Sequence, residues 1–144
     1  MRSSWDLGGP ITAPPFVRAT AGGLRVGCVV DRSRLAWFDP AAAKVQWYET
    51  PGADPIVGAP QLAGDRLIVA DQSGLTVALD AATGKPAGDG HQLRGSVAPV
   101  ATPVPLSNNV LLAPLSDGTL QLLPLARLIK GTASARRAAV SPAR

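Results

Sequence analysis

The chain has 144 residues, of which 46% are hydrophobic and only 17% charged, and it contains 15 Gly and 14 Pro. This mixture of core-forming and turn-forming residues is spread along the whole chain, is typical of many short strands joined by tight turns, and excludes a wholly disordered protein. The net charge of +4 belongs to residues 127–144, which carry five cations and no acid, because residues 1–126 carry nine Lys or Arg against ten Asp or Glu.

The chain shows no sign of a targeting or membrane-spanning segment. Its start, residues 1–10, lacks the apolar core of a signal peptide. No stretch approaches the roughly 20 apolar residues that are needed to cross a bilayer. Cys28 is the only cysteine, which excludes an internal disulfide and says nothing about the redox compartment. From these features we expect a chain without a leader or a membrane span.

A repeat of about 44 residues organises the chain. Each of its three copies opens on a proline-led segment, and the first prolines are 45 and 44 residues apart: Pro10, Pro55 and Pro99. Each opening is followed by an apolar run, a polar turn and a second apolar run. The first runs are 24–30, 67–70 and 110–113, and the second runs are 35–38, 75–79 and 120–123. Each copy therefore predicts strand, strand, tight turn and strand, with room for a fourth strand.

The turns and the strands indicate how the repeats pack. Gly74 and Gly118 lie 44 residues apart between apolar runs, where glycine accepts the positive φ of a hairpin turn. Residues 67–70 are apolar at successive positions, so both faces of this strand must be buried. Stacked blades of a β-propeller meet this requirement at this period. An immunoglobulin-like sandwich leaves the repeat unexplained, and a helical solenoid conflicts with the frequent Pro and Gly.

We therefore predict an all-β fold, a partial β-propeller of about three four-stranded antiparallel blades. The blades are expected at approximately residues 5–52, 53–96 and 97–126, followed by a basic flexible tail over residues 127–144. Closed propellers have at least four blades, so three blades leave apolar terminal faces exposed. Such faces predict a protein partner, self-association, or membership of a larger propeller.

Residues 65–85 of the second copy closely resemble the PQQ-like (quinoprotein-like) repeat. That repeat occurs in quinoprotein alcohol dehydrogenases and in an outer-membrane assembly lipoprotein of the same fold. Its hallmark is Ala-x-Asp-x-x-x-Gly-x-x-x-Trp, in which the Trp docks between adjacent blades. The second copy matches at Ala78, Asp80 and Gly84 but has Gly88 at the Trp position.

The first copy has the complementary match to this motif. Asp39 and Trp47 stand at the proper spacing, with Ala43 at the Gly position, and the third copy has Pro124 at the Asp position. The resemblance implies that the Asp and Gly of each copy shape a turn and that Trp47 buries its ring between sheets.

The enzymes of this family would require PQQ and Ca²⁺ at the propeller axis, together with a catalytic Asp. Three blades cannot enclose such an axis, and Cys28 cannot supply the adjacent-cysteine pair of those enzymes. The single His91 makes neither a multi-His metal site nor a Ser–His–Asp arrangement. The recurring Asp31, Asp71 and Asp117 are interpreted as turn formers at strand ends. The residues therefore predict no cofactor, no metal and no catalytic set.

We expect a non-catalytic repeat module that acts as a protein-interaction or assembly scaffold. The alternative is the C-terminal part of a PQQ-dependent dehydrogenase. Trp5, Arg94 and the loop after Gly84 are candidate contact points. The cationic tail lacks aromatic residues that would stack bases, so nucleic acid and membrane are not favoured as partners, and no small-molecule substrate is indicated. The resemblance implies a periplasmic or cell-envelope location.

Overall fold

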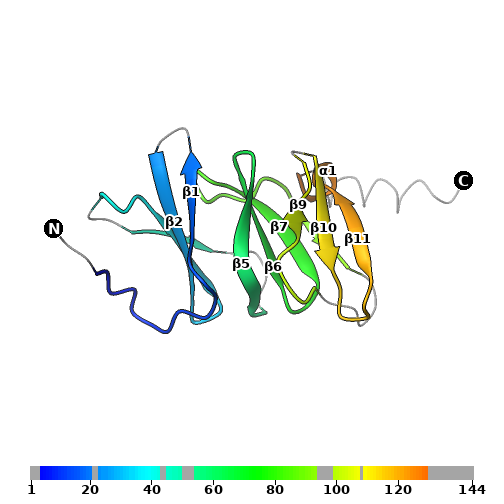
Figure 1. Cartoon of the computed structure of the whole chain (residues 1–144), viewed down its shortest axis with the longest axis horizontal. Helices are drawn as coiled ribbons and strands as arrows, with labels where there is room; N and C mark the ends of the chain where they lie inside the picture. Colours follow the sequence, from blue (N-terminus) through cyan, green and yellow to red (C-terminus); the bar gives the residue numbers. More distant parts are fainter. Residues whose placement is uncertain are drawn as a thin grey trace, which may run out of the picture.

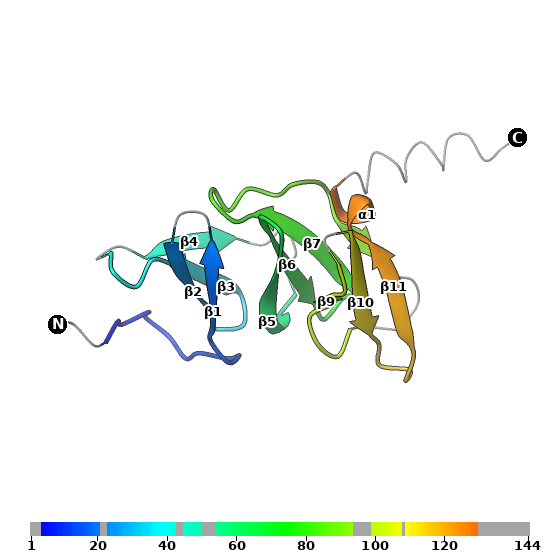
Figure 2. The ribbon, with the colours of Figure 1, turned by 45° about the horizontal axis from the view of Figure 1, so that its top comes forward.

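Three antiparallel sheets lie side by side in chain order and are followed by one short helix (Figure 1). The computed structural model describes residues 4–20, 23–42, 45–49, 54–93, 99–107 and 109–129. A second view shows the sheets spread like the blades of a fan, each turned relative to the one before (Figure 2). The predicted all-β fold and partial β-propeller are confirmed.

The strands of each sheet follow one another along the chain, and every neighbouring pair is antiparallel. The first sheet contains β1 (Phe16–Thr20), β2 (Gly23–Val30), β3 (Arg34–Phe38) and β4 (Gln46–Glu49). The second contains β5 (Ile56–Ala63), β6 (Arg66–Asp71), β7 (Leu75–Asp80) and β8 (His91–Gln92). The third contains β9 (Val104–Pro105), β10 (Val110–Pro114) and β11 (Leu120–Pro124), and α1 (Leu125–Ile129) follows it directly.

The proline-led segments lie at equivalent places in the three sheets. In each copy the segment runs antiparallel beside the end of the second strand of its own sheet. The paired residues are Ile11 with Val30, Ile56 with Asp71, and Pro99 with Leu115. In the first two copies the residue directly after the second strand donates its backbone N–H to the proline carbonyl: Asp31 to Pro10 and Gln72 to Pro55, each at 2.9 Å. The 44-residue period is therefore the period of one sheet.

The hairpin turns confirm the predicted role of glycine in two of the three copies. Gly74 and Gly118 have φ of 96° and 87°, a region that residues with a Cβ enter only at a cost. In the first sheet Asp31 and Arg32 occupy the left-handed region instead, with φ of 55° and 62°. The carbonyl of Arg32 accepts the N–H of Ile56 at 2.7 Å, so this turn also holds the first sheet to the second.

Two of the three recurring carboxylates hold turns, as predicted. Asp71 Oδ1 accepts the backbone N–H groups of Ser73 at 2.9 Å and Leu75 at 3.1 Å. Asp117 Oδ1 accepts the N–H and the hydroxyl of Thr119. Asp31 differs, because it lies within its turn and pairs with the Arg34 guanidinium at 3.3 Å.

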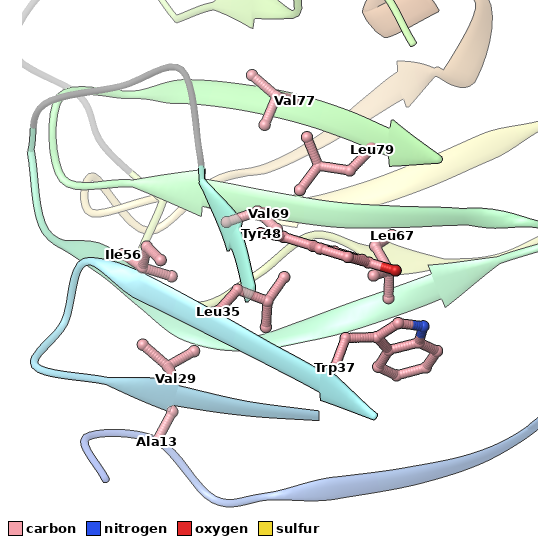
Figure 3. Close-up of a cluster of buried hydrophobic side chains, with 10 residues drawn as sticks. All are labelled: Ala13, Val29, Leu35, Trp37, Tyr48, Ile56, Leu67, Val69, Val77 and Leu79. Carbon is pink, nitrogen blue, oxygen red and sulfur yellow. The ribbon is translucent and has the colours of Figure 1, made fainter. Parts of the chain in front are cut away.

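Two apolar layers join the sheets, one on each face of the second sheet. The first layer holds the first sheet to the second, and it is formed by Ala13, Val29, Leu35, Trp37, Tyr48, Ile56, Leu67, Val69, Val77 and Leu79 (Figure 3). The second layer holds the second sheet to the third and to the helix, and it is formed by Ala63, Ile68, Ala78, Leu111, Leu123, Leu125 and Leu128. Leu67 and Ile68 are adjacent in β6 and enter opposite layers, which explains why residues 67–70 of that strand are apolar at successive positions.

The predicted start of the flexible tail at residue 127 is wrong. Residues 127–129 belong to α1, and Leu128 is completely buried against the second sheet. The backbone carbonyl of Leu128 also accepts the N–H of Gly90 at 3.0 Å. The apolar spacing of Leu125 and Leu128 places both on one side of a short helix, and this side closes the second layer. The rest of the predicted tail, residues 130–144, lies outside the described residues.

Candidate interaction surface

The motif residues of the second copy build a turn at the end of β7. Asp80 Oδ1 accepts the backbone N–H groups of Ala82 at 2.8 Å and Thr83 at 3.1 Å. Its other oxygen pairs with the Arg66 guanidinium at 3.2 Å. Ala78 is fully buried in the layer towards the third sheet, and Gly84 adopts φ of 75° to close the turn. In the first copy Asp39 holds the corresponding turn through the N–H of Ala41 at 2.8 Å.

An aromatic ring docks on this turn from the first sheet, but it belongs to Tyr48. A Cβ added at Gly84 would overlap the ring of Tyr48. The phenol hydroxyl donates a hydrogen bond to the carbonyl of Ala81 at 2.9 Å. Burial raises the pKa of Tyr48 above its usual value. The contact between Tyr48 and Gly84 therefore holds the first sheet against the second.

The expectation that Trp47 buries its ring between sheets is wrong. Its side chain is 42% exposed, and the guanidinium carbon of Arg34 lies 4.7 Å from the ring centroid. Neighbouring residues of a strand point to opposite faces, so once Tyr48 faces the second sheet, Trp47 must face away from it. The residue that does dock is the aromatic next to Trp47 in the sequence. It could be identified only once the strand register was known.

The glycine at the Trp position of the second copy also has a structural reason. A Cβ at Gly88 would overlap the backbone carbonyls of Leu128 and Ile129. The helix α1 therefore lies where the motif would place an aromatic ring, and only a glycine admits its backbone so closely.

The hydrogen bonds at Asp80 lead to a prediction about how the stability of the fold depends on pH. The backbone N–H groups of Ala82 and Thr83 are the main reason that the pKa of Asp80 lies below its usual range. A lowered folded-state pKa stabilises the fold above the unfolded value of about 3.9, and this stabilisation is lost as pH falls through the folded value. We expect Asp80→Asn to lower the melting temperature at pH 7 and the difference from wild type to shrink as pH falls below about 4.

Thermal unfolding followed by circular dichroism between pH 7 and pH 2 checks this expectation. The matched control is Asp89→Asn, which changes an exposed carboxylate that follows the same turn. A constant difference between wild type and Asp80→Asn across this range would contradict the role given to Asp80.

The start of the chain covers part of the outer face of the first sheet, on which Val17, Leu24 and Trp47 stay exposed by 53%, 55% and 42%. The buried residues of this face are Cys28, Val30, Ala36 and Phe38, and Leu7 packs against them with 8% of its surface exposed. The ring of Trp5, one of the predicted contact points, lies 5.6 Å from that of Phe38. Burial raises the pKa of the Cys28 thiol. Arg94, another predicted contact point, lies outside the described residues.

No described residue covers the outer face of the third sheet. A shift of 44 residues, the spacing of the two turn glycines, takes the buried Thr76 and Ala78 to Leu120 and Leu122. Thr76 and Ala78 are 1% and 0% exposed, whereas Leu120 and Leu122 are 66% and 61% exposed. The difference arises because the third sheet covers the second, while the described residues place nothing over the third.

We name this surface the open face and define it by four residues of the third sheet. Leu112 is paired with both Leu122 and Val104, so the three side chains lie on one face, and alternation along β11 adds Leu120. The open face therefore consists of Val104, Leu112, Leu120 and Leu122. Sequence reasoning predicted exposed terminal faces, and the structure shows that the start of the chain covers part of one of them, while no described residue covers the other.

Other kinds of site find little support in the described part of the chain. No group of three or more His, Cys, Asp or Glu side chains there could hold a metal ion. No described helix is both long enough and apolar enough to pass through a bilayer.

Comparison with known proteins supports the fold. No family model and no curated protein matches the chain. Among solved structures, the chain is similar to BamB from Moraxella catarrhalis, with a TM-score of 0.66 and 21% identity over 84% of this chain and 35% of that one. It is also similar to the computationally designed Ika4 protein, with a TM-score of 0.51 and 11% identity over 85% of this chain and 96% of that one. The chain thus spans about a third of BamB, and the likeness to this β-propeller shows a partial propeller fold.

Proposed function

We propose that this chain is a non-catalytic PQQ-like repeat module that serves as a protein-interaction or assembly scaffold, and that it contacts its partner through the open face. The observation that carries the proposal is the contrast between equivalent positions. Ala78 is fully buried by the next sheet, and its equivalent Leu122 is 61% exposed. An exposed face whose counterparts are all covered by protein is suited to cover by another protein.

The use of the carboxylates supports a role without catalysis. Asp39, Asp71, Asp80 and Asp117 accept hydrogen bonds from backbone groups two to four residues further along the chain. A carboxylate engaged in its own turn is a scaffold element, so these groups are not gathered at one place to act on a substrate. The PQQ-like repeat also occurs in an assembly lipoprotein, which agrees with a scaffold.

Light scattering on the purified chain tests this proposal. We expect the mean mass of the wild type to rise with concentration, because the open face lacks its partner, and we expect the double variant Leu120→Gln/Leu122→Gln to remain a monomer. The matched control is Leu24→Gln, which changes a leucine of the first sheet that is 55% exposed and should behave like wild type. A wild type that stays monomeric at every concentration, indistinguishable from the double variant, would contradict the proposal.

A further inference from the structure

The third sheet differs from the other two at its outer edge. The first two sheets continue beyond their third strands, β3 and β7, into the fourth strands β4 and β8. The third sheet ends at β11 within the described residues, and the chain after Pro124 turns at once into α1. The helix packs against β7 of the second sheet, so it does not take the place of a fourth strand beside β11.

The hydrogen-bond register of β11 shows which backbone groups face this edge. Leu125 N–H donates to the Asn109 carbonyl at 2.8 Å, and Leu115 N–H donates to the Thr119 carbonyl at 2.9 Å. These bonds lie at the two ends of the β10–β11 pairing. Hydrogen-bonded and non-hydrogen-bonded pairs alternate along an antiparallel ladder, so Gln121 and Leu123 exchange bonds with β10. Leu120 and Leu122 direct their backbone N–H and C=O groups to the open edge.

The same two residues carry the most exposed side chains of the open face. Leu120 and Leu122 therefore offer hydrogen-bonding groups at the edge and apolar surface on the face. The sequence of β11 contains no charged residue, and its ladder with β10 pairs residue for residue without a bulge. Charges and bulges are the features that usually prevent strand addition at an edge. Only Pro124, at the end of the strand, lacks an N–H.

The size of the open face favours an added strand as its tightly bound occupant, since a second copy packed face to face would bind only weakly through so small an area. The transfer free energies of Leu and Val side chains correspond to roughly 60–120 Å² each. With Leu120, Leu122 and Val104 exposed by 66%, 61% and 46%, the face offers on the order of 200 Å². A stable protein interface buries about 800 Å² on each partner. An occupant needs the backbone bonds of the edge in addition to the apolar face.

We propose that an extended segment of a partner protein pairs with β11 and becomes the fourth strand of the third sheet. The segment carries apolar side chains at alternate positions, which lie on the open face beside Leu120 and Leu122. This inference rests on the proposed scaffold function and names the kind of partner segment that the scaffold takes.

A peptide with the sequence of residues 44–50, which includes β4, is a suitable probe, because β4 is the fourth strand of the first sheet. We expect the fluorescein-labelled peptide to bind the full chain saturably in an anisotropy titration. We also expect hydrogen exchange of the Leu120 and Leu122 amides to slow in the complex. The amides of Gln121 and Leu123 serve as internal controls, since they are already bonded to β10 and should change little.

Two variants distinguish the contribution of the backbone groups at the edge from that of the apolar side chains on the open face. Leu122→Pro removes an N–H that faces the edge, and the strand tolerates it because Pro124 occupies the same kind of position two residues later. We expect Leu122→Pro to weaken peptide binding by about tenfold or more, through the lost bond and the ring. Leu122→Ala keeps the N–H and should weaken binding much less.

The outcomes distinguish this inference from the proposed function. No saturable binding, equal losses for Leu122→Pro and Leu122→Ala, or unchanged exchange at Leu120 and Leu122 would overturn strand addition. If light scattering still showed association that depends on the open face, the scaffold function would stand without it. The exchange measurement uses the wild-type chain, so it decides the question even if Leu122→Pro does not fold.

Discussion

Replacement of Gly84 by alanine is expected to lower the free energy of unfolding by about 2–4 kcal/mol. Two effects combine at this position. The backbone has φ of 75°, which strains any residue with a Cβ, and the added methyl group overlaps the ring of Tyr48. The ring cannot retreat freely, because its hydroxyl is bonded to the Ala81 carbonyl at 2.9 Å. Denaturant unfolding followed by circular dichroism measures the change.

Gly64 provides a matched control for this substitution. It has a similar φ of 61°, but an added Cβ meets nothing within 4 Å. Gly64→Ala should therefore cost only the backbone strain, about 1 kcal/mol. In a Tyr48→Ala background, Gly84→Ala should fall to the same cost, since the ring is gone. Equal costs for Gly84→Ala and Gly64→Ala in the wild-type background would show that the contact between Tyr48 and Gly84 adds nothing to the free energy of unfolding.

Replacement of Leu128 by alanine is expected to cost about 2–5 kcal/mol. Leu128 is completely buried in the layer between the second sheet, the third sheet and α1, so truncation leaves a cavity in a packed core. The neighbouring Arg127 is exposed, and Arg127→Ala should change stability by less than about 0.5 kcal/mol. Chemical denaturation of both variants tests the difference. A Leu128→Ala variant as stable as Arg127→Ala would contradict the buried position of Leu128 and would support its assignment to a flexible tail.

The repeat was predictable because it leaves physical marks that need no long-range knowledge. Turn glycines such as Gly74 and Gly118 are required by the backbone, and apolar runs such as residues 67–70 are required by burial on both faces. These marks sufficed for the three antiparallel sheets and for the turn-forming role of Asp71 and Asp117, but the predicted fourth strand of the third sheet is not among the described residues, and Asp31 pairs with Arg34 instead. They also predicted that three sheets would leave terminal faces exposed.

The features that the sequence did not predict depend on register and on contacts between sheets. Trp47 and Tyr48 are adjacent aromatics, and only the pairing of β3 with β4 decides which of them faces the second sheet. Gly88 appeared as a missing Trp, whereas it makes room for the backbone of α1. The helix itself interrupts an all-β pattern after Pro124, and its role depends on packing between the second and third sheets, which no local pattern records.

The cover that Trp5 and Leu7 place over the first sheet is partial, and this bears on how copies of the molecule can associate. Apolar side chains stay exposed at both ends: Val17, Leu24 and Trp47 on the outer face of the first sheet, by 53%, 55% and 42%, and Leu120 and Leu122 on the open face, by 66% and 61%. Contact between unlike ends would add copies head to tail and produce a ring or a filament, whereas contact between two open faces would stop at a pair. A strand donated by another protein would compete with either association, because it occupies the open face.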